Sequence, residues 1–185
     1  MTTDRMFSFI GGPDGPWRVE RVIAVKGDTL AKPARVHTVN ALAPDAANAA
    51  WTLRGVTSNQ RYVTHSENKK LVAVQPALNR PEATCAALIP IRKTAEWWAL
   101  PQDDRRALFE AQSKHIEIGM RYLPAIARKL HHSRDLGEPF DFLTWFEYAP
   151  THAPAFDELL HALRTSREWD YVDREVDIRL VRGVD

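Results

Sequence analysis

The chain has 185 residues, of which 44% are hydrophobic, so it can bury a core of its own as one or two closely packed units. Its 25 Lys and Arg balance 24 Asp and Glu, and no run of five like charges occurs. Nucleic acid and anionic membranes are therefore poor candidates as partners. The single cysteine, Cys85, excludes an internal disulfide and a zinc site of several thiolates.

The first ten residues contain Asp4 and Arg5 and then only a short apolar stretch. This stretch is too short for a secretion signal or a transmembrane span. We therefore expect a cytoplasmic protein without a membrane partner.

The N-terminal half is predicted to consist of strands and loops. Apolar and β-branched residues indicate strands at residues 5–10, 17–25 and 51–57, and the turn GGPDGP separates the first two. Residues 26–50 are rich in Pro, Ala and Asp and indicate a long loop with room for one short strand. Residues 63–72 favour a short helix.

The C-terminal half has a clearer order of elements. Hydrophobic periodicity, turn residues and helix-capping residues mark each of them. They are predicted as a strand at 83–93, a helix at 101–118, strands at 126–135 and 140–148, a helix capped by Thr151, and a strand at 175–182.

The order of these elements, βαββαβ, is that of a ferredoxin-like unit, in which two helices pack on one face of an antiparallel sheet. Residues 83–185 form the complete unit, and residues 1–82 indicate a shortened relative of it. Two such sheets side by side predict an α+β barrel. A cavity between sheet and helices could then hold a large flat ligand.

His115 is the first candidate for chemistry. It follows Ala111 by four residues and Leu108 by seven, so on one continuous helix all three share an inward stripe. A lone histidine on an apolar stripe is usually packed in the core, but neutral imidazole is also the commonest metal ligand. His131 and His132 lie on opposite faces of a strand, cannot both bind one metal, and are read as structural or solvated.

Arg128 is the second candidate. It alternates with Ile126 and Leu130 on one face of its strand, so its guanidinium points where the apolar side chains point. Arginine keeps its charge when buried and needs an anion. That anion is either a neighbouring carboxylate or an anionic substrate or intermediate.

Lys93 and Glu168 are the third candidate, because the βαββαβ order can bring the end of the first strand near the end of the last helix. One interpretation is a surface ion pair. The other is that Glu168 accepts the outer N–H of a metal-bound imidazole while Lys93 fixes the carboxylate. The sequence lacks GxGxxG, P-loop, HExxH and GxSxG motifs, so the residues by themselves lead no further.

From Trp51 onward the sequence resembles the chlorite dismutase family. The matching runs are WTLRGVTSNQRY (51–62), LIPIRKTAEWW (88–98), YLPAIARKLHH (122–132) and DLGEPFDFLTWFE (135–147). Four blocks in the family's order are a specific signal, and the region around Glu168 extends it. Residues 1–50 add little to it.

The resemblance implies a haem b protein in which His115 is the proximal iron ligand and Glu168 its hydrogen-bond acceptor. Lys93 would be the partner of Glu168, and Arg128 the distal catalytic residue. The positions that the resemblance places at the haem propionates are Asn59, Tyr62 and Trp97.

The implied reaction converts chlorite into chloride and dioxygen with formation of the O–O bond, and Arg128 holds the anions in place. Two alternatives exist on the same fold. A coproheme decarboxylase-like enzyme carries a different distal residue, and a non-catalytic haem carrier or sensor gives Arg128 no reaction to serve. The short N-terminal half resembles the family's shorter lineage, which forms homodimers, and this expectation rests on analogy alone.

Overall fold

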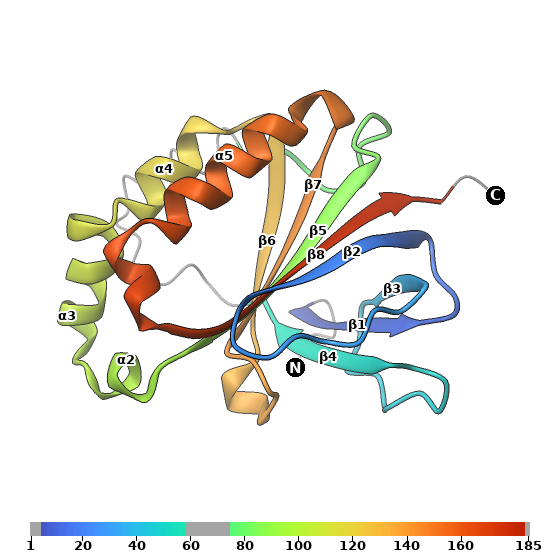
Figure 1. Ribbon diagram of the computed structural model, residues 1–185, viewed down its shortest axis with the longest axis horizontal. Coiled ribbons are helices and arrows are strands. Elements are labelled where there is room, and N and C mark those ends of the chain that lie inside the picture. Colours follow the sequence, from blue (N-terminus) through green and yellow to red (C-terminus); the bar gives the residue numbers. More distant parts are fainter. Residues whose placement is uncertain (1–4, 58–74, 184–185) are drawn as a thin grey trace.

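The computed structural model describes residues 5–57 and 75–183. Its strands close into one antiparallel barrel in the order β1-β3-β2-β8-β5-β7-β6-β4. The labelled helices all lie on one side of this barrel, next to the C-terminal strands (Figure 1). The expected α+β barrel is therefore present, and a mixed α/β architecture is confirmed.

The N-terminal half supplies the strands β1 (Met6–Gly12), β2 (Trp17–Lys26), β3 (Arg35–Val39) and β4 (Trp51–Val56). Three of them confirm the predicted strands, and β3 is the short strand within the predicted loop. Alternation sets which face is buried: in β4 every second residue, beginning with Trp51, faces the barrel interior. The helix predicted at 63–72 lies outside the described residues.

The C-terminal half follows the predicted order of elements. Its strands are β5 (Cys85–Lys93), β6 (Ile126–His132), β7 (Phe142–Tyr148) and β8 (Val172–Arg182). Its helices are α2 (Ala95–Ala99), α3 (Gln102–Arg106), α4 (His115–Arg121) and α5 (Ala153–Arg164), with short 3-10 turns η3 (Arg134–Leu136), η4 (Pro150–His152) and η5 (Arg167–Tyr171). His152 precedes α5, so the predicted cap at Thr151 is wrong.

The single helix predicted at 101–118 is also wrong. After α3 the chain forms a π-helical segment, η2 (Ala107–Gln112), and Lys114 has a left-handed φ of 51° before α4 begins at His115. A π-turn changes the helical period, and a positive φ ends the α-helical hydrogen bonding. Ala111 is consequently exposed while Leu108 is buried, so the shared inward stripe does not exist.

The apolar residues form two clusters, one on each face of the C-terminal sheet. The barrel interior contains Phe9, Trp17 and Trp145, and the space between sheet and helices contains Phe146 and Phe156. Because both faces of β5 are covered, its apolar run is nearly continuous, as predicted. No helix in the described part of the chain is long and apolar enough to cross a membrane.

His131, inside the barrel, predicts an acid sensitivity of the fold. Its side chain is 1% exposed, its Nδ1 donates to the Leu143 carbonyl at 3.1 Å, and burial lowers its pKa from 6.5 to about 4. The unfolded chain takes up this proton first, so stability is lost as the pH falls from 6.5 towards 4. Between pH 7 and pH 4.5 we expect this group to cost about 2–3 kcal/mol.

Urea unfolding of the parent and of His131→Gln at both pH values measures this effect. The variant should lose less stability on acidification than the parent by that amount. His161→Gln, on the exposed side of α5, is the control and should follow the parent. Equal acid losses in parent and His131→Gln would contradict the prediction.

Candidate active site

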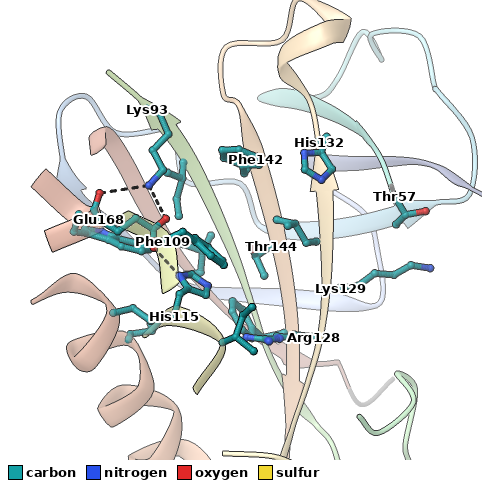
Figure 2. A pocket seen from close by; sticks show the side chains of 18 of the residues that line it. Thr57, Lys93, Phe109, His115, Arg128, Lys129, His132, Phe142, Thr144 and Glu168 are labelled. Atoms are coloured by element: carbon teal, nitrogen blue, oxygen red, sulfur yellow. Dashed lines mark hydrogen bonds and ion pairs between the residues drawn. The ribbon is translucent and has the colours of Figure 1, made fainter. Parts of the chain in front are cut away.

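A cavity of about 360 Å³ lies between the C-terminal sheet and the helices that cover it. Strands β5, β6 and β7 form one wall, and η2, α4, α5 and η5 form the other. Figure 2 shows 18 of the side chains that line it. The surface of the cavity is largely apolar. This size and lining are typical of a pocket for a small ligand or cofactor.

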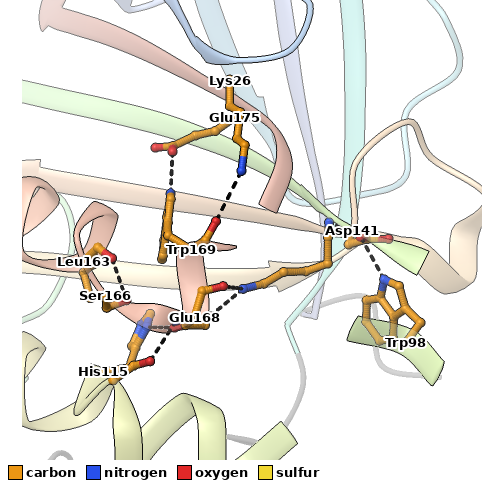
Figure 3. A network of polar contacts seen from close by, with 11 residues as sticks. Lys26, Trp98, His115, Asp141, Leu163, Ser166, Glu168, Trp169 and Glu175 are labelled. Carbon is orange, nitrogen blue, oxygen red and sulfur yellow. Dashed lines mark hydrogen bonds and ion pairs between the residues drawn. The ribbon is translucent and has the colours of Figure 1, made fainter. Parts of the chain in front are cut away.

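His115, Glu168 and Lys93 form one chain of contacts along this cavity (Figure 2). Figure 3 shows the contact of His115 with Glu168 from another side. Nδ1 of His115 lies 2.7 Å from Glu168 Oε2, and Lys93 Nζ donates to Glu168 Oε1 at 2.7 Å. The side chains of Lys93 and Glu168 are only 3% and 5% exposed. The interpretation as a surface ion pair is therefore wrong, and the structure brings together three of the predicted site residues.

Glu168 is held as a carboxylate by its neighbours. Burial acts to raise its pKa, but the close contacts with His115 and with the Lys93 ammonium outweigh it and lower the pKa to about 2. Its backbone N–H donates to Ser113 Oγ at 2.9 Å, directly at the break between η2 and α4. The helix break that sequence periodicity missed thus helps to place the carboxylate beside the histidine.

The His115 ring is fixed by stacking as well as by Glu168. Its centroid lies 4.3 Å from the ring of Phe109 and 6.5 Å from that of Trp169, both nearly parallel to it. Since a carboxylate oxygen accepts at Nδ1, the proton belongs on that nitrogen, and Nε2 is left with the lone pair that binds a metal. The arrangement can therefore present one oriented imidazole to a metal-containing ligand.

Arg128 lines the same cavity as His115, from strand β6 (Figure 2). Within residues 5–57 and 75–183 its guanidinium has no ion pair with a carboxylate, and burial lowers its pKa. The carboxylate interpretation of Arg128 therefore finds no partner in the described part of the chain. A desolvated cation beside an open cavity is suited to an anionic ligand.

Gly119 of α4 gives the Arg128 guanidinium its space. A Cβ at this position would lie 2.4 Å from Arg128 Nη1, closer than any normal contact. Gln75 supports the same residue from the other side, because its Nε2 donates to the Arg128 carbonyl at 2.8 Å. Sequence reasoning missed both residues, since neither belongs to a periodic pattern or to a motif.

Trp97, in the short helix α2 that follows β5, lines the cavity and is 2% exposed. Its Nε1 is buried without a hydrogen-bond partner among the described residues. A buried donor of this kind is normally satisfied by a ligand or by water. Asn59 and Tyr62, the other two positions implied for haem propionates, lie outside the described residues.

Comparison with known proteins gives one family. The family model described as chlorite dismutase matches residues 35–183. The chlorite dismutase of Ideonella dechloratans is 29% identical over 154 residues, which cover 74% of this chain and 51% of that protein. The chain thus spans about half the length of this curated relative.

Two solved structures extend the comparison. The crystal structure of dimeric chlorite dismutases from Nitrobacter winogradskyi is 52% identical, covers 96% of this chain and 99% of that chain, and superposes with a TM-score of 0.89. A mutant chlorite dismutase from Candidatus Nitrospira defluvii is 21% identical, covers 99% of this chain and 93% of that chain, and has a TM-score of 0.67. At that identity the second likeness shows the fold alone.

Proposed function

This chain belongs to the chlorite dismutase family, and we propose that it is a haem b-dependent enzyme that converts chlorite into chloride and dioxygen. The observation that carries the proposal is that the contact chain Lys93–Glu168–His115 lines the same cavity as Arg128, which has no carboxylate partner among the described residues. The first part orients a metal ligand, and the second offers a fixed positive charge to an anion.

The residues of the cavity fit a haem. His115 Nε2 would bind the iron, and the walls are largely apolar. The buried Trp97 Nε1 has no hydrogen-bond partner among the described residues, and a propionate would supply one. Haem iron, when bound, supplies the oxygen-atom transfer that splits chlorite. We propose His115 as the ligand, with Glu168 and Lys93 behind it and Trp97, Asn59 and Tyr62 at the propionates.

Arg128 has the role of holding anions on the opposite side of the cavity. Its charge is already desolvated, so it would need little reorganisation when chlorite or an anion derived from it binds beside the guanidinium. Retention matters because the O–O bond forms only if both oxygen atoms remain in the same cavity. A donor of this kind contributes about 3–4 kcal/mol in other enzymes.

Chlorite dismutase activity accounts for Arg128, whereas a haem carrier or sensor leaves it without a role, and a coproheme decarboxylase-like enzyme carries another residue there. We further propose a homodimer, as in the dimeric relative from Nitrobacter winogradskyi. The two ferredoxin-like halves, residues 1–82 and 83–185, and the cytoplasmic location remain predictions.

Oxygen evolution on adding chlorite to the haem-loaded protein tests the proposal. One O₂ and one chloride should form for each chlorite consumed, since ClO₂⁻ contains both atoms of the dioxygen. A haem-loaded protein that consumes chlorite without releasing O₂ would refute the activity. If bound coproheme treated with peroxide instead loses CO₂ from its propionates, as detected by mass spectrometry, the decarboxylase alternative would be favoured.

Glu168→Gln should keep the haem but raise the reduction potential of its iron. A neutral amide draws less on the Nδ1 proton of His115, which makes the imidazole a weaker donor to the oxidised iron. Removing a hydrogen-bond partner of this kind typically changes metal affinity about 10–100-fold. At about 59 mV per tenfold for one electron, the reduction potential should rise by roughly 60–120 mV. Spectroelectrochemistry measures it.

Glu110→Gln is the matched control. Glu110 Oε2 accepts the backbone N–H of Ile116 at 2.8 Å, so the change removes a carboxylate near α4 without touching His115. Its potential should stay close to that of the parent. An unchanged potential in Glu168→Gln would remove the proposed role of Glu168.

A further inference from the structure

Asp141 is a buried carboxylate outside the residues assigned so far, and it is 5% exposed. Its Oδ2 accepts the backbone N–H of Lys93 at 2.7 Å and the indole Nε1–H of Trp98 at 3.1 Å. Its Oδ1 lies 3.5 Å from Nη1 of Arg134, a side chain that is 47% exposed. Figure 3 shows this carboxylate between the end of β5 and α2.

The position of Asp141 extends the pairing of β5 with β7 beyond its last regular step. That step pairs Ile91 with Phe142, and the Asp141 backbone N–H then donates to the Ile91 carbonyl at 2.8 Å. The Asp141 side chain accepts the next backbone N–H of β5, that of Lys93. On the other side of β5 the pairing with β8 is irregular between Arg92 and Lys93, so the carboxylate holds the strand where its pairing with β8 shifts register.

The same carboxylate also fixes α2. This helix is only five residues long, and the Trp98 indole that binds Asp141 is part of it. Trp97, one residue earlier, places its ring 4.4 Å from Lys93 Nζ. Asp141 therefore holds both the backbone of Lys93 and the helix whose tryptophan covers the Lys93 ammonium.

We propose that Asp141 is a positioning residue that holds Lys93 against Glu168 and thereby sets the negative charge that Glu168 presents to His115. The inference rests on the proposed function, because that charge matters for a bound iron. It also makes a claim about the protein without haem, namely that the backbone of Lys93 is held by Asp141.

The proposal predicts the direction in which the iron reduction potential changes, whereas a general loss of stability predicts no particular direction. Lys93 withdraws part of the charge of Glu168, so releasing Lys93 leaves more charge for the Nδ1 proton of His115. The imidazole becomes a stronger donor, and the iron reduction potential falls. This shift is opposite in sign to the one expected for Glu168→Gln.

Amide hydrogen exchange of Lys93, followed by NMR in the haem-free protein, tests the contact itself. Asp141→Ala should reduce the protection of this amide about tenfold or more, because a charge-assisted hydrogen bond is lost. Asp141→Asn keeps an acceptor oxygen and should retain most of the protection. Asp135→Ala removes an exposed carboxylate nearby and is the control.

The iron potential of the haem-loaded protein tests the consequence. Asp141→Ala should lower the potential, and Asp141→Asn should lie close to the parent. In a Lys93→Met background the change Asp141→Ala should add no further shift, because the two act through one interaction. If Asp141→Ala does not fold, Asp141→Ser carries the same expectations, since its shorter side chain cannot reach both donors.

Unchanged exchange at Lys93 in Asp141→Ala would overturn the proposal. So would an unchanged or higher potential, or an equal shift in the parent and Lys93→Met backgrounds, since Asp141 would then only stabilise the fold. If the parent takes up no haem, the proposed function fails by itself. The exchange measurement then still decides whether Asp141 holds Lys93.

Discussion

His115→Ala is expected to lose stable haem binding. His115 is the only histidine from α3 to the end of α4, and its Nδ1 contacts the Glu168 carboxylate that Lys93 holds. Mutating only the hydrogen-bond partner of a metal ligand changes metal affinity about 10–100-fold. Loss of the ligand itself should therefore weaken haem binding by more than about 100-fold. Haem titration followed at the Soret band, with haem-to-protein stoichiometry after gel filtration, measures this.

His132→Ala is the matched control, because His132 also lines the cavity but comes from β6 on the opposite wall (Figure 2). It should retain the haem. Imidazole added to His115→Ala should restore part of the binding, because the truncated side chain leaves room beside Glu168 for a free ligand. An unchanged Soret spectrum and stoichiometry in His115→Ala would show that another residue binds the iron.

Arg128→Ala should still bind haem but lose turnover. Arg128 lines the cavity from β6, whereas His115 lies in α4, so loss of the arginine should leave the proposed ligand in place. Removing one preorganised donor of this kind lowers kcat by about 10²–10³-fold. We also expect faster bleaching during turnover, because hypochlorite that is no longer held escapes and attacks the macrocycle. Oxygen yield per haem, with a hypochlorite scavenger present, measures both effects.

Thermal unfolding separates this role from a structural one. A desolvated guanidinium without a carboxylate partner among the described residues costs stability, so Arg128→Leu should unfold at the parent's temperature or a few degrees higher. Lys129→Ala removes a neighbouring cation of the same strand and should lose far less activity. If oxygen yield and hypochlorite release match the parent while only the melting temperature falls, Arg128 belongs to the scaffold and the proposed role is wrong.

Local patterns were sufficient for most of the fold. Turn residues and alternation located the strands of both halves, and the unbroken apolar run at β5 correctly indicated a strand covered on both faces. The region of α3 to α4 failed because one helical period was assumed throughout. The π-helical segment and the left-handed Lys114 rotate the following residues onto another face of the helical region. The spacing of apolar residues in the sequence does not reveal this rotation.

For the site, the sequence by itself determined the reactive groups: one histidine near the end of the helical region, an arginine within an apolar strand, and a Lys–Glu pair at the ends of elements that the βαββαβ order brings together. Only the tertiary structure decided whether these groups are buried and which of them touch. Burial depends on which helices cover the sheet, and that cover turned a presumed surface ion pair into the buried Lys93–Glu168 contact.

The supporting residues were also decided by tertiary structure alone. Gly119 and Asp141 matter because segments distant in the chain approach them, Arg128 in one case and Lys93 in the other. A glycine in a helix and an aspartate after a turn carry no local signal of such a partner. The sequence thus determines the chemistry that is available, and the packing of sheet against helices determines which groups act together, because hydrogen bonds and charges act only over a few ångströms.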